Sequence, residues 1–278
     1  MVEPRLRLRS LGPYLLLLLL TSPVLLGYLW LVIATFSHST TGLVPDDFTL
    51  QNWDFLWDFT NWQDSVWGVT LNTVVLAAGL AIMVVALSAL SGYSLSRLDF
   101  AGRRQFMSMT LILHAFPGIT LLIAIYFVLR TLGLYNSIGG VILVKVALEL
   151  PLGIWLMKGF FDNVPWDIER AALVDGAGRF RVWWQIVLPL IRPGIAALAI
   201  FSFISGWNEF LIPYTFILGQ QQSTLAVYLN QLSNDTRFVD YGQVAAVGLF
   251  QLLPVLIFFL FTQRYLLSIY AGGVKGGT

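Results

Sequence analysis

Lys145 and Glu149 are opposite charges in the middle of a long apolar stretch of the chain. They are four residues apart, so on a helix both lie on one face and can form an ion pair. Charges inside a membrane are costly and usually face the protein interior or a water-filled cavity. We therefore interpret Lys145 and Glu149 as an intramembrane pair, whose charges either neutralise each other or border a wet pathway.

A second polar group, Trp207, Asn208 and Glu209, interrupts another apolar stretch shortly before Pro213. An amide, a carboxylate and an aromatic face are natural contacts for a polar solute. Two interpretations stay open: these side chains line a pore, or they hold a helix that is broken near Pro213.

Residues that could support catalysis or bind a metal are sparse. The two histidines, His38 and His114, are far apart in the sequence, and there is no cysteine. We interpret His114 as a packed or pore-facing polar residue. No Gly-x-x-x-x-Gly-Lys-Ser/Thr sequence occurs, so a phosphate-binding loop is not expected. We expect no catalytic residues, no metal site and no cofactor on this chain.

The polar segment 162–193 has the pattern of two short helices joined by a turn. Pro165 suits the first turn of a helix. Asp167 and Glu169 follow where the helix dipole favours negative charge. Gly176 is placed to end that helix in a left-handed conformation.

The second helix of this segment is expected from about residue 179 to 187, stopping before Pro189. Ala171 and Ala172 in the first helix have almost no side-chain bulk. They would let the backbone of another protein approach closely.

Composition sets the class of the whole chain. Of its 278 residues, 57% are hydrophobic and 11% are charged, against about 25% charged residues in soluble domains. The net charge of +1 gives no argument for nucleic acid. Apolar stretches of about 18 residues or more indicate membrane helices. We predict a single all-α integral membrane domain, 1–278, with six transmembrane helices at about 11–36, 69–96, 106–129, 137–157, 194–218 and 243–263.

The first apolar run, 11–36, is too long for the core of a signal peptide, so we interpret it as a retained helix. Basic residues gather before it, in the loops 97–104 and 158–192, and near the C-terminus. Aspartates are concentrated between the first and second predicted helices and between the fifth and sixth. The positive-inside rule then predicts that both termini and the loop 162–193 are cytoplasmic.

The loop 162–193 resembles the EAA loop of binding-protein-dependent ABC import permeases, the element that docks into the ATPase subunit. Arg170 stands where that family usually has the glutamate directly before the alanine pair. We call 162–193 the coupling loop. The residues that carry the resemblance, and to which it assigns ATPase docking, are Glu169, Ala171, Ala172, Asp175, Gly176, Ala177, Ile186, Leu188 and Pro189.

Further segments resemble the carbohydrate branch of this family, in particular the six-span second permease subunit of maltose-type transporters. They are Tyr93–Arg103, Leu132–Asn136, Trp155–Phe161, Trp207–Phe210 and Ala271–Gly276.

The resemblance implies a type I importer in the cell inner membrane that moves a sugar or sugar-like solute. It implies as partners a second permease subunit in a heterodimeric pore, two ATPase subunits that carry the ATP and magnesium, and an extracytoplasmic solute-binding protein.

Two other functions remain as alternatives. A permease for glycerol-phosphate or another polar solute shares the same motifs. An ATP-independent secondary transporter is less favoured, because it normally shows paired repeats that this sequence lacks.

Overall fold

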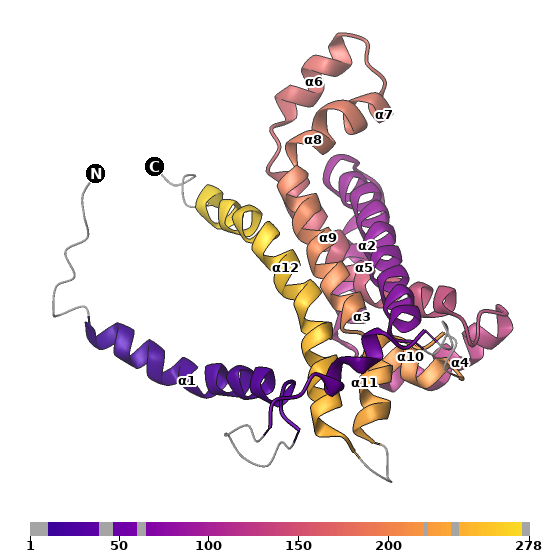
Figure 1. The fold of residues 1–278 in the computed structure, drawn as a ribbon. Coiled ribbons are helices and arrows are strands. Elements are labelled where there is room, and N and C mark those ends of the chain that lie inside the picture. Colours follow the sequence, from indigo (N-terminus) through magenta and orange to yellow (C-terminus); the bar gives the residue numbers. More distant parts are fainter. Residues whose placement is uncertain (1–10, 39–46, 60–64, 220–221, 235–238, 274–278) are drawn as a thin grey trace. The chain divides into compact units, whose positions relative to one another are not determined.

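The computed structural model describes residues 11–38, 47–59, 65–219, 222–234 and 239–273 (Figure 1). These residues form helices, and the only strand-like pairing among them is one antiparallel bridge between Ser37 and Phe48. The topology prediction depends in part on residues outside the described ranges, namely the cations Arg5, Arg7, Arg9 and Lys275. The chain divides into two compact units, Met1–Phe59 with Leu229–Pro254, and Thr60–Tyr228 with Val255–Thr278.

The first unit contains helix α1 (Leu11–Ala34), the short helix η2 (Gln51–Leu56) and the beginning of α12 (Tyr241–Gly273). The side-chain amide of Asn52 holds the end of α1, donating hydrogen bonds to the carbonyls of Thr35 at 3.1 Å and Ser37 at 3.0 Å. Carbonyls at a helix end have no partner within the helix, so this amide replaces part of what the backbone lacks.

The second unit is built on α2 (Val66–Arg97), α5 (Ile138–Asp162) and α9 (Arg192–Trp207), which pack side by side. Glycines allow this close approach. A Cβ atom on Gly206 would lie 2.8 Å from Ala77 Cα of α2, and one on Gly92 would lie 2.9 Å from the backbone nitrogen of Lys158. Small residues at helix contacts are typical of membrane proteins, where close packing drives association.

The six predicted spans correspond only in part to single helices. By length and hydropathy, α1, α2, α5 and α12 could each cross a membrane. The described residues reach six such segments if two bent helix pairs each count once, Arg103–Ala115 with Gly118–Thr131 and Arg179–Leu190 with Arg192–Trp207. The predictions 11–36, 69–96, 137–157 and 243–263 each fall on one of these four helices. The predictions 106–129 and 194–218 were wrong as single helices.

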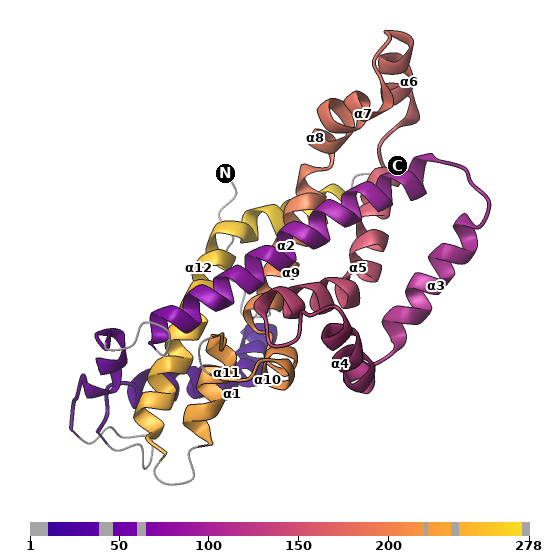
Figure 2. The same ribbon diagram turned by 90° about the vertical axis from the view of Figure 1, so that its right-hand side faces the viewer.

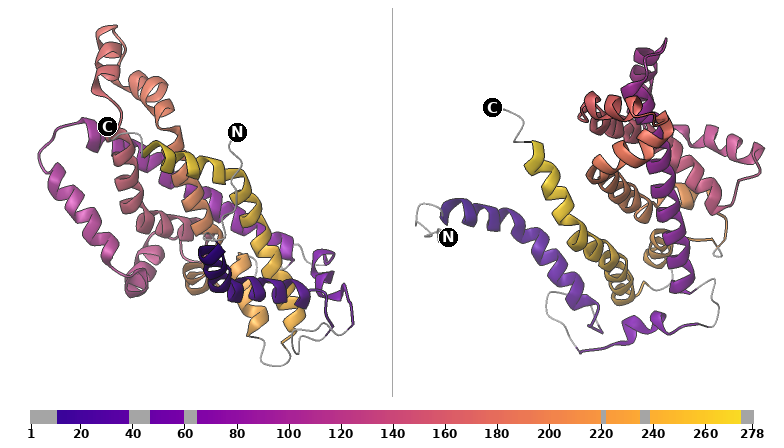
Figure 3. Two further views of the ribbon diagram at one scale, coloured as in Figure 1. Left: turned by 90° about the vertical axis from the view of Figure 1, so that its left-hand side faces the viewer. Right: turned by 90° about the horizontal axis from the view of Figure 1, so that it is seen from above.

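The stretch 106–129 bends by 92° between α3 (Arg103–Ala115) and the run formed by η3 (Gly118–Leu121) and α4 (Leu122–Thr131) (Figures 2 and 3). Pro117 lies in the break. Proline lacks the N–H that continues a helix, and it favours an extended conformation at the preceding residue. Phe116 has that conformation, with φ −76° and ψ 127°.

The stretch 194–218 is also broken. Helix α9 ends at Trp207, and a separate short helix, α10 (Leu211–Phe216), follows. The break lies at residues 208–210, earlier than the predicted position near Pro213, which belongs to the first turn of α10. Helix α11 (Leu225–Ser233) leads from there towards α12.

Candidate functional site

The coupling loop forms two helical arms that stand beyond the ends of α2, α5 and α9 (Figures 1 and 2). The first arm is α6 (Trp166–Val174), and the second runs through α7 (Arg179–Val182), η4 (Trp183–Val187) and α8 (Leu188–Leu190). The prediction that the second arm stops before Pro189 was wrong. A proline ring clashes with the carbonyl four residues earlier, here that of Gln185, and Gln185 lies in η4, a wider π-helical turn that relaxes this crowding.

Gly176 forms the turn between the arms, with φ +86°. The N–H of Gly176 donates to Leu173 O at 3.1 Å, and the N–H of Ala177 donates to Ala172 O at 3.1 Å. These two bonds are the Schellman pattern of a helix that ends at a left-handed glycine. Ala172 and Ala177 both pack on the same buried cluster, which supplies the apolar contact that usually accompanies this motif.

The alanine pair faces two ways. Ala171 is exposed, whereas Ala172 is half-buried against the core of its own unit. The small size of Ala172 is therefore required within this chain, and Ala171 is the alanine of the pair that stays exposed. Of the other residues predicted to dock an ATPase, Asp175 and Gly176 are exposed, while Ala177, Ile186, Leu188 and Pro189 are half-buried.

Large apolar side chains project from the two arms of the coupling loop. Val174 is 86% exposed, Phe180 is 71% exposed and Trp184 is 57% exposed. We name these three residues the docking patch. Exposed apolar side chains on an otherwise polar loop are typical of surfaces that bind another protein.

Glu169 points away from that surface. Its side chain is 3% exposed and forms an ion pair with Arg97 at the end of α2. The hydroxyl of Tyr93 donates a second hydrogen bond to this carboxylate, at 3.1 Å. In this chain the carboxylate of Glu169 is thus engaged internally, and its predicted role in docking would have to act through the position of α6.

A cavity of about 960 Å³ lies in the second unit, between α3, α4, α5, α9 and α10. Its wall is mostly apolar, with leucine the most frequent residue and a few polar groups, the composition typical of small-molecule sites of about 300–1,000 Å³. The polar groups that line it are His114, Lys145, Glu149, Ser202, Ser205 and Glu209.

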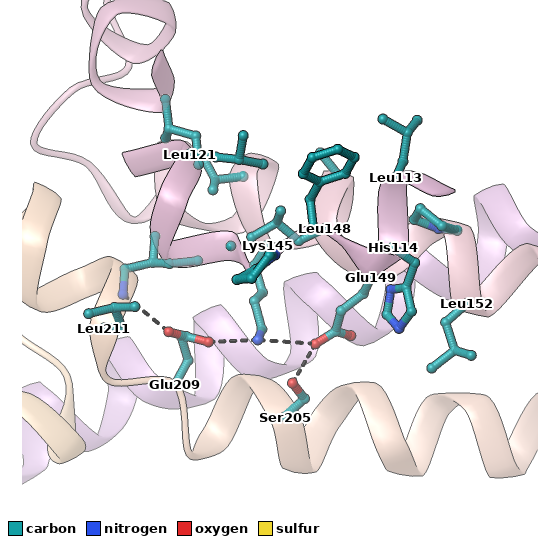
Figure 4. Close-up of a pocket in the computed structure, with 18 of the residues that line it drawn as sticks. Leu113, His114, Leu121, Lys145, Leu148, Glu149, Leu152, Ser205, Glu209 and Leu211 are labelled. Atoms are coloured by element: carbon teal, nitrogen blue, oxygen red, sulfur yellow. Dashed lines mark hydrogen bonds and ion pairs between the residues drawn. The ribbon is translucent and has the colours of Figure 1, made fainter. Parts of the chain in front are cut away.

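Three of these polar residues form one network, which we name the charged triad: Lys145, Glu149 and Glu209 (Figure 4). Lys145 Nζ lies 3.4 Å from Glu149 Oε1 and 2.6 Å from Glu209 Oε2. The Ser205 hydroxyl donates to Glu149, and the N–H of Ile212 donates to Glu209 Oε1 at 3.1 Å.

The charged triad and Ser205 together join three elements, because Lys145 and Glu149 belong to α5, Ser205 to α9, and Glu209 to the break before α10. Lys145 is the only lysine or arginine among the described residues that line the cavity. The triad can therefore offer a polar solute both hydrogen-bond donors and acceptors on an otherwise apolar wall.

Only one residue of the predicted group Trp207, Asn208 and Glu209 lines this cavity. Trp207 is 2% exposed and stacks on Phe203. Asn208 bonds back to its own helix, donating to Ile204 O at 2.9 Å, and is not part of the cavity wall. The structure thus places only Glu209 of these three residues on the wall of this cavity, because the break after Trp207 turns the neighbouring side chains in different directions.

Sequence reasoning missed two partnerships. Glu209 shares Lys145 with Glu149, and Arg97 holds Glu169, although both pairs are distant in the sequence. The available signals were a single arginine, Arg97, at the end of a predicted span and a single glutamate, Glu209, near a predicted helix break. Neither signal identifies the partner of the residue. No group of three histidine, cysteine or acidic residues that could hold a metal occurs in the part of the chain that the structure describes.

Comparison with known proteins identifies the family of this chain. The family described as "Binding-protein-dependent transport system inner membrane component" matches residues 84–267. The diacetylchitobiose uptake system permease protein of Streptomyces coelicolor is 35% identical, with 95% of this chain and 86% of that protein aligned. The maltodextrin transport system permease protein of Bacillus subtilis is 30% identical, with 97% of each chain aligned.

Among solved structures, a chain from a bacterial ABC transporter that imports the acidic polysaccharide alginate has the same fold. The TM-score is 0.80 at 21% sequence identity, covering 95% of this chain and 99% of that one. The similarity places the helix arrangement described above in the fold of ABC importer permeases.

Proposed function

Because the chain belongs to the family of binding-protein-dependent transport system inner membrane components, we propose that it is a pore-forming subunit of an ATP-driven importer of a sugar or sugar-like solute. Relatives named for diacetylchitobiose and maltodextrin, aligned over nearly the whole chain, support this solute class.

The observation that carries the proposal is the coupling loop with its exposed docking patch. Its two arms are held rigid by the Gly176 turn, and their outward apolar side chains stay exposed in the isolated chain. ATP-driven import needs a rigid contact through which ATPase closure reaches the membrane helices. The coupling loop is that contact in our proposal, and ATP hydrolysis, with its magnesium, belongs to a separate subunit.

The cavity with the charged triad is this subunit's part of the solute pathway. It has the size and the mixture of apolar wall and convergent polar groups that small-molecule sites need. Hydroxyl groups of a sugar can donate to Glu149 and Glu209 and accept from Lys145. Of the three residues predicted to border the pathway, Glu209 is the one that lies on this cavity.

The full assembly in this proposal contains a second permease subunit, two ATPase subunits and an extracytoplasmic binding protein that delivers the solute. The positive-inside rule supports a cytoplasmic position for the coupling loop and for both termini. The chain lies in the cytoplasmic membrane, which is the inner membrane where a cell has two.

Co-purification tests the proposal directly. Expressed with its partner subunits, the chain should retain an ATPase in detergent, and binding protein loaded with diacetylchitobiose or maltodextrin should stimulate ATP hydrolysis. A chain that moves either sugar into vesicles without any ATPase would be a secondary transporter, and the proposal would fail.

Topology can be tested separately, because the chain has no cysteine. A cysteine at Gly178 should react with an impermeant thiol reagent only from the cytoplasmic face, and one at Trp57 only from outside. Labelling of Gly178→Cys in intact cells would contradict the proposed orientation.

A further inference from the structure

Arg97 is the last residue of α2, and its side chain is 3% exposed. Its guanidinium forms an ion pair with Glu169 through Nε and donates from Nη2 to the carbonyl of Val164 at 2.7 Å. It also lies over the ring of Trp166, 4.7 Å from the ring centroid. One side chain of α2 thus contacts three residues at the beginning of the coupling loop.

Tyr93 lies one helical turn before Arg97, on the same face of α2. Its hydroxyl donates to the other oxygen of Glu169 at 3.1 Å. Its ring packs on Phe161 at the end of α5 and on Trp183 in the second arm of the coupling loop, with centroid distances of 5.4 Å and 6.4 Å. Two residues of α2 therefore hold Glu169, while Tyr93 also contacts the arm that follows.

The same end of α2 is bonded to α5. Ser96 accepts from Arg97 Nη1 at 3.3 Å and donates to Asp162 at 2.6 Å. The ends of α2, α5 and α6 thus meet in one hydrogen-bonded network with the Arg97–Glu169 pair at its centre.

A buried ion pair is weak evidence for stability, because removing two charges from water offsets much of their attraction. Separating its partners inside the protein is strongly unfavourable, because each charge is then buried without a counter-charge. Moving α6 away from the end of α2 therefore has a high free-energy cost, whereas the two helices can move together without separating the pair.

We infer that the Arg97–Glu169 ion pair is the rigid link that carries movement of the coupling loop into α2. This inference rests on the proposed function, since it requires an ATPase docked on the loop. Helix α2 packs closely along α5 and α9 at Gly92 and Gly206, and α5 and α9 form part of the cavity wall. Arg97 and Glu169 are positioning residues, because they act on the pathway through α2.

A double substitution separates this role from a role in folding. Arg97→Met/Glu169→Met removes both charges and keeps apolar bulk, a change that proteins often tolerate, whereas a single substitution leaves one buried charge. Lys158→Met is the matched control. It removes a cation at the edge of the same network, whose own ion pair with Asp162 stays within α5, and it keeps Arg97, Glu169 and the two partners of the Ser96–Asp162 hydrogen bond.

The readout is a single cysteine at Leu152, an exposed residue that lines the cavity of this otherwise cysteine-free chain. The complete complex with its ATPase is treated with N-ethylmaleimide, with and without magnesium, ATP and vanadate. The rate of labelling should differ between the two states in the Leu152→Cys complex and in the Lys158→Met control. In the double variant the ATPase should stay bound. The ratio between the labelling rates with and without magnesium, ATP and vanadate should shrink by about tenfold, a common size for allosteric coupling.

The outcomes are distinguishable. If the double variant shows the same ratio of labelling rates as the Leu152→Cys complex, the inferred link is wrong, because the Arg97–Glu169 pair would then serve folding only. A double variant that releases the ATPase also overturns it, because the pair would then set docking instead of carrying movement. Absence of an ATPase from the Leu152→Cys complex would overturn the proposed function itself. Glu169→Gln, which keeps the shape of the side chain, should reduce the ratio less than the double variant.

Discussion

Lys145 Nζ lies 2.6 Å from Glu209 but 3.4 Å from Glu149, although Glu149 is its neighbour one turn along the same helix. The closer partner belongs to the helix break before α10, so Lys145 joins two segments of the cavity wall. The charged triad also holds two carboxylates for one lysine. The Lys145–Glu149 pair that helix spacing predicts is thus only one of the two ion pairs that Lys145 forms.

Lys145→Met should leave two carboxylates in the cavity wall without a counter-charge. Breaking a buried ion pair typically costs about 3–5 kcal/mol, and we expect a loss towards the lower end, since these side chains keep some exposure. Adding Glu209→Gln should recover more of the thermal stability in detergent than adding Glu149→Gln, because the Glu209 side chain is the more buried of the two carboxylates, 10% exposed against 21%. Equal recovery by the two second substitutions would contradict the geometry of the triad.

Gly176→Val should leave the membrane helices inserted but misplace the second arm of the coupling loop. The site is open, with no atom within 4 Å of an added Cβ, so the effect comes from the backbone alone. A left-handed conformation costs a residue with a side chain about 1–2 kcal/mol, and a β-branched one more. The ATPase that co-purifies, and its stimulation by loaded binding protein, should both fall.

Two variants control this test. Gly178 is also open but has φ −68°, which any residue adopts, so Gly178→Ala should behave as wild type. Gly176→Asn should lose less than Gly176→Val, since asparagine tolerates the left-handed region. If Gly178→Ala and Gly176→Val lose the ATPase equally, the conformation of Gly176 is not what matters.

Substitutions of the two alanines should separate stability from docking. Ala172→Leu overfills a half-buried site against the core, at a cost of about 1–3 kcal/mol, so the thermal stability of the purified chain should fall. Ala171→Leu places its bulk on the exposed side, so stability should stay near wild type while ATPase retention falls. A similar loss of stability in both variants would show that the two positions do not face opposite ways.

The docking patch should matter for ATPase binding and not for folding. Phe180→Ser changes a side chain that is 71% exposed, and such surface changes usually shift stability by only about 0.5 kcal/mol. If Phe180 is a central contact, affinity for the ATPase should fall by about 2 kcal/mol, or about 30-fold. Phe100→Ser, at an exposed phenylalanine in the loop after α2, is the control and should keep the ATPase.

The class of protein and the local shape of the coupling loop follow from the sequence alone. Hydrophobic content and the length of the apolar runs dictate membrane helices, because each backbone polar group in lipid must be satisfied within its own segment. The left-handed turn at Gly176 and the helix before it depend on residues a few positions apart, and the structure has both. Motif spacing likewise indicated the family.

Only the tertiary structure decided which side chains meet. The inward direction of Glu169, the sharing of Lys145 with Glu209, and the burial of Trp207 all depend on how helices distant in the sequence pack together. The periodicity of one helix shows which of its residues share a face, but not which helix covers that face. Where a span bends was also undecided, because proline is tolerated inside α5 at Pro151 and ends a helix at Pro117. Neighbouring helices can satisfy the backbone groups that a proline leaves unpaired, and that compensation exists only once the chain is folded.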